Sequence, residues 1–431
     1  MHLCLFEDAR VQHLRPLTET RPVYDLRLGI RTLLDTTADA FPAQNLLLHS
    51  RPLVAPITAQ TYDDEAVHVN ALPHETDVLF VNGRFVATNG PAVEQIREHV
   101  QANAKARTFT HDGTLVAAWV PRASARLPDN VLSTSSLSPA PFADLPTTSL
   151  DEATLITQPW DLLTLLRPAL RRDADARSTP STAPLSARPQ ASVHESVIGV
   201  QPDRISLGRG VTVCPGAILN AEAGPIVIDD EATISEQAVI KGPCYVGPKT
   251  QIKVGASIEG AAFGYYCKVG GEVHDTIIHS LSNKAHPGFL GHSYLGRWCN
   301  LGADTNISNL KNNYGEISAY APAEDAFVPT GRRFAGLLMG DHSKCAINTM
   351  FNTGTVVGTY CNLYGGDFPP QYLPPFSWGR PHAGFSTYRL SKALEVAEHV
   401  MSRRDRSLTD ADRTLLSTLF EETAAERDAH H

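Results

Sequence analysis

The chain has 431 residues, of which 42% are hydrophobic and 19% charged, with a formal net charge of -9 at pH 7. This length allows two or three domains, and the modest charge is unlike that of a nucleic-acid-binding face or a polybasic membrane patch. The seven cysteines are scattered and never form a C-x-x-C pair, which argues against a disulfide framework or a zinc knuckle. No apolar stretch is long enough to span a bilayer, and the first residues lack the apolar run of a signal peptide. We therefore expect a cytoplasmic protein with no membrane or nucleic-acid partner.

The first third of the sequence predicts a small α/β domain. Short apolar runs bounded by turn formers, at residues 3–6, 45–48 and 77–83, predict buried strands. Helical spacing is found at residues 26–34, 91–103 and 160–170. We predict an α/β domain over residues 1–177, which includes a Pro/Ser-rich segment, followed by a linker over residues 178–196.

A six-residue repeat dominates the second half of the chain. An aliphatic residue occupies every sixth position at Ile228, Ile234, Ile240, Val246, Ile252 and Ile258, and the same period marks Leu207, Val213, Leu219, Phe289, Leu295, Leu301 and Ile307. Neither the helical period of 3.6 nor the strand period of 2 explains this spacing. Hexapeptide repeats are typical of a parallel β-helix, which we predict over residues 197–379. The repeat slips between Ile258 and Phe289, and an irregular insert interrupts it at about 316–334.

The C-terminal segment has a different pattern. The prolines of residues 368–379 cannot donate the hydrogen bonds of a strand ladder and end the repeats. Residues 387–402 and 409–425 then carry amphipathic helical patterns, the second with a plausible N-cap at Thr409. We expect C-terminal helices over residues 380–431 that cover the open end of the β-helix.

The densest group of polar residues lies inside the repeats, at residues 282–315. Ordinary hexad positions need only small turn residues, whereas this stretch concentrates histidine, lysine, arginine, asparagine and aspartate. The slip just before it predicts a loop or bulge, a place where a rigid scaffold presents functional groups. His286 is a titratable residue of this stretch, and a pKa near 6.5 lets a histidine accept a proton at neutral pH. The alternative for His286 is an exposed turn residue with no role, and His292 and His342 are better explained as structural.

This stretch resembles the acetyltransferase half of the bifunctional GlmU family. The family motifs KAGHLTYLGD, NIGAG and NYDG have the counterparts Lys284-Ala285-His286-Pro287-Gly288-Phe289-Leu290-Gly291-His292, Asn300-Leu301-Gly302-Ala303-Asp304 and Asn313-Tyr314-Gly315. The resemblance implies a left-handed β-helix, a homotrimer, and acetyl-CoA-dependent N-acetylation of an amino-sugar phosphate such as glucosamine-1-phosphate or of a nucleotide-sugar. Such a reaction belongs to the biosynthesis of UDP-N-acetylglucosamine.

The resemblance also implies roles for individual residues. It makes His286 the general base and Ala303 a contact of acetyl-CoA. The substrate contacts that it implies are Lys253, Lys284, Phe289, Asn300, Lys311, Asn313 and Tyr314. Phe289 stands where the family has a tyrosine, and Lys253 stands where it has an arginine, so that the charge is kept and the bidentate fork is lost.

The N-terminal domain resembles sugar-nucleotide pyrophosphorylases. The stretch HLRPLTETRPV at residues 13–23 is similar to their RLRPLT-x-TRPK motif, and DVLFVNGR at residues 77–84 is similar to their strand ending in N-G-D. The resemblance places nucleotide contacts at Thr18, Arg21 and Asn82. The chain has Val23 in place of the motif lysine, Arg84 in place of the magnesium-binding aspartate, and LFEDARVQ in place of the glycine-rich loop. We therefore expect doubtful nucleotidyltransferase activity, with Mg²⁺ needed only if that domain is active.

Two alternatives to an acetyltransferase remain open. In the first, the N-terminal domain is an active sugar-1-phosphate nucleotidyltransferase despite its substituted residues. In the second, the β-helix is a non-catalytic scaffold that binds sugar nucleotides.

Overall fold

The computed structural model of the protein describes residues 1–74, 76–88, 90–102, 105–128, 130–177, 185 and 189–431. The chain forms two compact units. Unit 1 comprises Met1–Leu14, Thr20–Leu26 and Arg31–Gln158, and unit 2 comprises Arg15–Glu19, Arg27–Ile30 and Pro159–His431. Most of the predicted linker, residues 178–184 and 186–188, lies outside the described residues. None of the described helices is long and apolar enough to cross a membrane.

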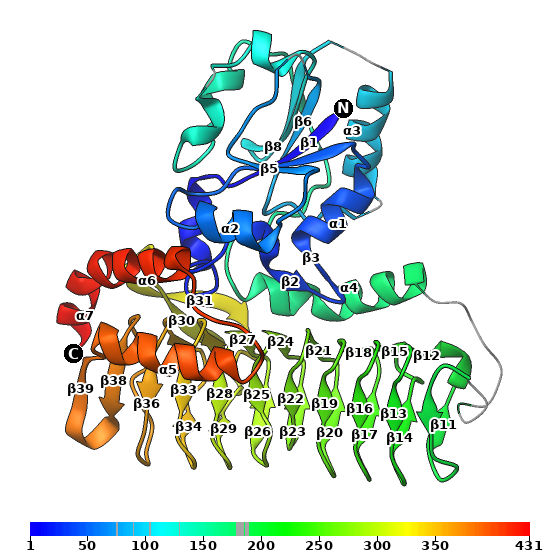
Figure 1. Cartoon of the computed structure of the whole chain (residues 1–431), viewed down its shortest axis with the longest axis vertical. Helices are drawn as coiled ribbons and strands as arrows, with labels where there is room; N and C mark the ends of the chain where they lie inside the picture. The colour runs from blue at the N-terminus through cyan, green and yellow to red at the C-terminus, as the bar shows by residue number, and fades with distance from the viewer. Residues whose placement is uncertain (75, 89, 103–104, 129, 178–184, 186–188) are drawn as a thin grey trace. The chain divides into compact units, whose positions relative to one another are not determined.

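Unit 1 is built on a seven-stranded sheet with the order β5-β4-β1-β6-β8-β7-β9 (Figure 1). Its strands are β1 (His2–Phe6), β4 (Asn45–Leu48), β5 (Val67–Val69), β6 (Val78–Asn82), β7 (Arg107–His111), β8 (Thr114–Val120) and β9 (Thr147–Ser149). Strands β4, β1 and β6 are parallel, and β8 is antiparallel to β6. The chain runs from β1 to β4 on one side and later returns to β6 on the other side. The strand order therefore reverses between β1 and β6, the point where open α/β sheets bind their ligands.

The helices of unit 1 are α1 (Leu33–Ala40), α2 (Ala55–Thr61) and α3 (Pro91–Gln101). The predicted strands and the helix at 91–103 are confirmed. The predicted helix at 26–34 is wrong, because residues 27–28 and 31–32 form the short strands β2 (Arg27–Leu28) and β3 (Arg31–Thr32). Gly29 lies between them with φ of +75°, a left-handed conformation that stops a helix. Helix α1 begins only after Thr32, whose side chain forms a capping box with Asp35.

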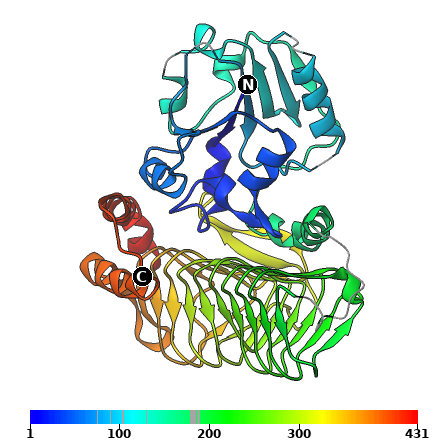
Figure 2. The same ribbon diagram turned by 45° about the vertical axis from the view of Figure 1, so that its right-hand side comes forward.

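Unit 2 is a parallel β-helix with three sheets, whose stacked coils are seen in Figure 2. Sheet 1 contains β10 (Ser192–Val193), β13 (Thr212–Val213), β16 (Thr233–Ile234), β19 (Gln251–Ile252), β22 (Lys268–Val269), β25 (Asn283–Lys284), β28 (Asn300–Leu301), β33 (Lys344–Cys345), β36 (Asn362–Leu363), β38 (Ser377–Arg380) and the antiparallel β39 (Gly384–Thr387). Sheet 2 contains β11 (Ile198–Val200), β14 (Ile218–Asn220), β17 (Val239–Lys241), β20 (Ser257–Glu259), β23 (Glu272–His274) and β26 (Phe289–Gly291), followed by the pair β29 (Asn306–Ile307) and β34 (Met350–Phe351). Sheet 3 contains β12 (Ile205–Leu207), β15 (Ile226–Ile228), β18 (Cys244–Val246), β21 (Ala262–Phe263), β24 (Ile277–Ser280), β27 (Tyr294–Arg297), β32 (Leu337–Met339), β35 (Thr355–Val357) and β37 (Tyr372–Leu373). Three corners join the sheets: corner A leads from sheet 1 to sheet 2, corner B from sheet 2 to sheet 3, and corner C from sheet 3 to sheet 1.

The aliphatic residues of the six-residue repeat fill the interior of the β-helix. Every repeat residue from Ile228 to Ile258 belongs to one buried core. The predicted left-handed parallel β-helix and its C-terminal helices are therefore confirmed. The slip in the repeat has a geometric cause: the register Ile258↔Val273 makes that coil shorter than the 18 residues of the coil Ile240↔Ile258. As a result Leu290 is the interior residue, and Phe289, which the repeat placed inside, lies on the outer face of sheet 2.

Helices α5 (Leu390–Ser402) and α6 (Asp410–Glu422) pack on corner C, and α7 (Ala424–His430) follows them. The corner carries a column of rings in which Trp298 and His342 lie 5.7 Å apart, His342 and Tyr360 4.5 Å apart, and Tyr360 and Phe376 5.5 Å apart. All four residues have φ near +60°, so the same backbone turn recurs in each coil and stacks their side chains. The predicted N-cap at Thr409 is confirmed as a capping box with Asp412.

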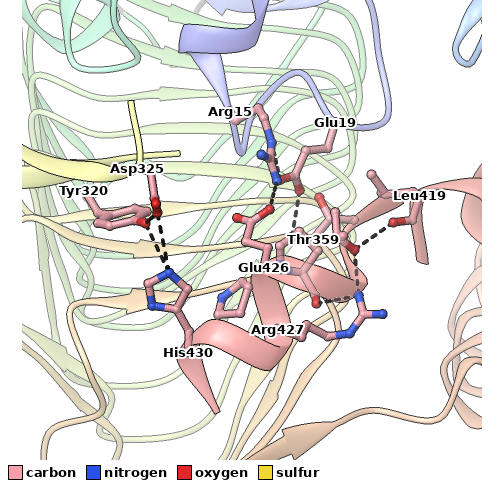
Figure 3. Close-up of polar contacts among 12 residues, drawn as sticks. Arg15, Glu19, Tyr320, Asp325, Thr359, Leu419, Glu426, Arg427 and His430 are labelled. Carbon is pink, nitrogen blue, oxygen red and sulfur yellow. Dashed lines mark hydrogen bonds and ion pairs between the residues drawn. The ribbon is translucent and has the colours of Figure 1, made fainter. Parts of the chain in front are cut away.

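The predicted insert at 316–334 contains an antiparallel hairpin, β30 (Ile317–Ala321) and β31 (Ala326–Arg332). Figure 3 shows how this hairpin, residues 15–19 and α7 meet on the last coils of unit 2. The Arg15 guanidinium pairs with Glu19 at 3.1 Å and with Glu426 at 2.8 Å. The Glu19 carboxylate also accepts a hydrogen bond from the Thr359 backbone N–H at 3.0 Å. The Arg15–Glu426 ion pair and the Glu19–Thr359 hydrogen bond each join segments more than 300 residues apart in the sequence.

Candidate functional site

His286 lies in corner A, in the turn between β25 and β26, and its side chain is exposed. Among the described residues, no side chain forms a hydrogen bond or ion pair with its ring. The turn needs a glycine at position 288, because Gly288 has φ of +113° and a Cβ there would lie 2.2 Å from the Thr305 carbonyl oxygen. The next coil also supports the turn, since the Asp304 N–H donates to the Pro287 carbonyl at 3.1 Å. The main chain is therefore fixed while the imidazole faces solvent.

Lys284 lies inside the β-helix and not in a surface site. Its side chain is 1% exposed and takes the interior position next to Val269. The ammonium donates to the Gly270 carbonyl at 3.0 Å, the His286 carbonyl at 2.8 Å and the Pro287 carbonyl at 3.4 Å. Burial lowers the pKa of Lys284 to about 8, and the charge of Asp304 opposes that shift. The direct substrate contact predicted for Lys284 is incompatible with this burial, and the residue instead ties the turn that carries His286 to the interior.

Two further predicted residues share corner A with His286. Lys253 follows β19, two coils before the His286 turn, because Ile252 pairs with Val269 and Val269 with Lys284. At the usual spacing of neighbouring strands this separation is about 10 Å. Ala303 follows β28 in the next coil after His286. Corner A thus brings together the predicted base, one predicted substrate contact and the predicted acetyl-CoA contact.

Asn300 and Phe289 flank this corner on two different faces. Asn300 is exposed on sheet 1, where its Oδ1 accepts from Asn283 Nδ2 at 3.4 Å. Phe289 lies on sheet 2, its ring 5.9 Å from that of His274. The two residues border His286 from opposite sides and do not contact one another through any described hydrogen bond.

His292 lies in corner B and has both ring nitrogens occupied. Its Nδ1 accepts from Asn309 Nδ2 at 2.9 Å, and its Nε2 faces the Asp275 carboxylate at 3.6 Å. Burial lowers the pKa of His292 to about 4, although Asp275 raises it. The imidazole is neutral at pH 7, but with its Nδ1 lone pair already accepting a hydrogen bond it has no free site for a substrate proton. His292 holds corner B together, in line with its expected structural role.

A pocket of about 570 Å³ opens near corner B. It is lined by Ser308, Leu310, Lys311, Asn312, Asn313, Asn352, Thr353 and Phe368. Two predicted substrate contacts, Lys311 and Asn313, are in this wall, while Tyr314 is 67% exposed. The Lys311 ammonium donates to the Glu316 carbonyl at 2.6 Å, and Asn313 Oδ1 accepts from the Gly315 N–H at 2.9 Å. The predicted sugar contacts therefore divide between two corners of one subunit.

In unit 1, an ion pair occupies the point where the strand order reverses. Asp8 follows β1 and Arg84 follows β6, and the guanidinium binds the carboxylate through Nε at 2.9 Å and a second nitrogen at 2.6 Å. Asn82 donates to the same carboxylate at 2.8 Å, and Arg84 is 1% exposed. Burial of Asp8 opposes ionisation, but the hydrogen bonds and charge of Arg84 outweigh it and hold the pKa of Asp8 below its ordinary value.

This arrangement does not fit a magnesium-bound triphosphate. The carboxylate is already neutralised by an internal guanidinium, and Arg84 brings positive charge to the place where a metal ion would need negative ligands. Asn82 is engaged within the network, Thr18 is fully buried, and Arg21 faces Asp25 at 3.5 Å. Among the described residues, no group of three or more His, Cys, Asp or Glu side chains could hold a metal ion. The sequence showed the replacement at Arg84 but not its partner Asp8, which lies 76 residues away.

Comparisons with known proteins identify a family model and several relatives that are similar to parts of the chain. Residues 3–181 match the sugar nucleotidyl transferase family model. A bifunctional sugar-1-phosphate nucleotidylyltransferase/acetyltransferase of Sulfurisphaera tokodaii is 26% identical over 159 residues, which cover 33% of this chain and 36% of that protein. The bifunctional protein GlmU of Rippkaea orientalis is 33% identical over 109 residues, covering 25% of this chain and 23% of its own length. That of a Synechococcus species is 21% identical over 221 residues, covering 43% and 30%.

These alignments span about a third or less of the length of the curated relatives. A crystal structure of UDP-N-acetylglucosamine acyltransferase aligns with 59% of this chain and 93% of its own, at 11% identity and a TM-score of 0.28. At that score the alignment adds nothing to the assignment of function.

Proposed function

Because the chain is a GlmU-related protein with a sugar nucleotidyl transferase domain at its N-terminus, we propose that its β-helix is an acetyl-CoA-dependent N-acetyltransferase. The acceptor is the amine of an amino-sugar phosphate, such as glucosamine-1-phosphate, or of a nucleotide-sugar. The product belongs to the biosynthesis of UDP-N-acetylglucosamine. All seven cysteines are free, in keeping with a cytoplasmic protein.

His286 acts as the general base in this proposal. Its imidazole takes a proton from the sugar amine as the nitrogen attacks the thioester carbonyl carbon. A C–N bond forms, the C–S bond breaks, and the proton on His286 passes to the leaving thiolate to give free CoA. Backbone N–H groups of the coils are the donors available to the oxyanion that forms on the carbonyl.

One observation carries the proposal: the imidazole of His286 is exposed and unengaged on a turn whose main chain is fixed. The buried Lys284 ammonium and the neighbouring coil hold that turn from within. A base in this setting keeps its orientation between turnovers, and its lone pair is available to substrate. His292, the other histidine of the motif region, lacks a free lone pair.

The proposed site is shared between subunits of a homotrimer. Lys253, Asn300 and Ala303 lie near His286, whereas Lys311 and Asn313 line the pocket at corner B. In the trimer, corner B of a neighbouring subunit would bring its Lys311 and Asn313 to the residues around His286 in corner A. Two apolar side chains of corner A support such a contact, since Val254 and Ile347 are each 63% exposed on either side of the His286 coil.

Thiol release from acetyl-CoA in the presence of glucosamine-1-phosphate tests the proposal. We expect His286→Ala to lower kcat by 10²–10⁴-fold, the usual contribution of a general base. The matched control is His194→Ala, because His194 is also exposed and follows a sheet 1 strand in corner A. Equal rates in the wild type and His286→Ala would exclude His286 as the base. If no amino-sugar promotes thiol release while nucleotide-sugars bind, the β-helix is a binding scaffold.

A further inference from the structure

Four basic side chains lie along the outer side of sheet 1, from corner C to corner A, and at the end of α5. Lys268 is in β22, Lys253 follows β19 in the preceding coil, and Arg403 and Arg404 follow α5. The Arg404 guanidinium lies 4.4 Å from the ring centre of Tyr266, two residues before Lys268. We call Lys253, Lys268, Arg403 and Arg404 the basic cluster.

The basic cluster is not neutralised within the protein. Among the described residues, no carboxylate lies within 4.0 Å of any of its four charged groups. Nε of Arg404 is buried and forms no hydrogen bond with a described residue. The C-terminus of α5 partly offsets the positive charge of the cluster, but a helix C-terminus carries only about half an elementary negative charge. Most of the positive charge therefore has no counterpart in the described part of the chain.

The charges also act on one another. Burial lowers the pKa of Lys268, and the charges of Arg404, Lys253 and Arg403 lower it further. Like charges held this close destabilise the fold unless an anion joins them. Such an arrangement is typical of an anion-binding site and unlike a solvated surface, where charges of both signs alternate.

An unpaired acceptor lies beside the cluster. Asn283 pairs with Lys268 in the sheet register, and its Oδ1 is buried without a hydrogen-bond partner among the described residues. A phosphate has no hydrogen to offer this oxygen at neutral pH, whereas a hydroxyl or an exocyclic amine has. The ligand should therefore carry both phosphate groups and hydrogen-bond donors.

We propose that the basic cluster binds the phosphorylated end of a nucleotide. The phosphates contact Lys268, Arg404 and their neighbours, and a ribose hydroxyl or a base amine donates to Asn283 Oδ1. The same chemistry occurs in the phosphoadenosine end of CoA and in the nucleoside diphosphate of a nucleotide-sugar. Binding of the phosphorylated end of a nucleotide requires no acyl transfer. The basic cluster can therefore be tested independently of His286.

Calorimetric titration of the full chain with adenosine 3′,5′-bisphosphate and, separately, with UDP tests the proposal. We expect saturable binding of at least one probe, weakened about tenfold or more in the double variant Lys268→Gln/Arg404→Gln, and weakened by added salt. Preference for the bisphosphate identifies the CoA end as the source, and preference for UDP identifies the nucleotide-sugar. His286→Ala should bind the preferred probe as the wild type does, even if the proposed acyl transfer is wrong.

Three controls separate binding from folding. Lys268→Arg keeps the charge and should keep the affinity. Lys241→Gln removes an exposed lysine from sheet 2, away from the cluster, and should leave binding unchanged. Thermal unfolding of each variant confirms that the fold is retained. Equal affinity in the wild type and the double variant, or no binding of either probe at millimolar concentration and low salt, would overturn the proposal.

Discussion

The most unusual residue of unit 2 is a charged one in an apolar position. Ile278, Lys284 and Leu290 occupy successive interior positions six residues apart, so the ammonium of Lys284 takes the place of an aliphatic side chain. The repeat did not predict this position, because the spacing counted from Ile258 falls on Ser282 and the spacing counted back from Phe289 falls on Asn283. The motif resemblance predicted a substrate contact at Lys284. Neither the repeat nor the motif therefore predicted an interior lysine.

Replacement of Lys284 by methionine should uncouple activity from stability. An apolar side chain of similar length removes a buried charge, which is often neutral for stability, but it leaves the His286 and Pro287 carbonyls without their donor. We expect the rate of CoA release to fall roughly tenfold through misplacement of His286, with a small change in the unfolding temperature. Steady-state kinetics and thermal unfolding measure the two effects.

The matched control is Lys344→Met. Lys344 is half-buried, has its pKa lowered to about 8 by desolvation, and donates to the His342 carbonyl at 2.7 Å in corner C. Its loss should not affect the His286 turn. An unchanged rate in Lys284→Met, or equal losses in both variants, would mean that Lys284 does not position His286.

At the scale of strands and turns, the sequence predicted regular parts better than their interruptions. The regular repeats give the interior residues from Ile228 to Ile258 correctly, since each coil there has room for three hexads. Between Ile258 and Leu290 a shortened coil moves the interior position by one residue. A fixed period cannot reveal such a change, because the choice between Phe289 and Leu290 depends on the length of the turns. For the same reason, the sequence did not show that His286 and the pocket lie at different corners.

The Asp8–Arg84 ion pair joins the turns after β1 and β6, and its contribution to stability can be tested. The pKa of Asp8 in the folded protein lies below its ordinary value, so the pair contributes stability above about pH 4, the unfolded pKa. That contribution is lost as the pH falls through the folded pKa. We expect Asp8→Asn to destabilise unit 1 by about 3–5 kcal/mol at pH 7 and by progressively less below about pH 4.

Thermal unfolding of the wild type and of Asp8→Asn between pH 2.5 and pH 7 measures the difference in their unfolding free energies. Asp112→Asn, in the exposed turn between β7 and β8, is the control within the same unit. A difference between wild type and Asp8→Asn that stays constant with pH would show that the pair does not stabilise the strand ends through its charge.

At the scale of the whole molecule, the proposed trimer makes a clear prediction about corner A. Val254 and Ile347 are large apolar residues exposed to solvent on either side of the His286 coil. Glutamate at both positions would place charges in a contact between subunits, which costs several kcal/mol for each unpaired charge. We expect the double variant Val254→Glu/Ile347→Glu to be monomeric in light scattering, while the wild type is trimeric.

Ile198→Glu serves as the control, since Ile198 is 54% exposed but lies on sheet 2 in an early coil. A wild-type protein that is monomeric at micromolar concentration would contradict the trimer. In a monomer, the predicted sugar contacts of corner A and corner B could not belong to one shared site.

The ring column of corner C has a further consequence for how the molecule comes apart. Coils of a solenoid contact only their neighbours, so each coil is held by its own interface. The coils that carry Trp298, His342, Tyr360 and Phe376 are held a second time, because α5 and α6 pack across several of them at once. The early coils carry Glu231 and Lys249 at the same corner, in the same left-handed conformation, without such a cover. The middle coils are held instead by α4 (Asp161–Arg177), whose Arg167 pairs with Glu259 and Asp275 and whose Arg177 pairs with Asp229. The earliest coil residue that α4 reaches through a described hydrogen bond is Ala223. Opening should therefore begin in the coils before Ala223, so that the His286 turn keeps its shape while those first coils fray.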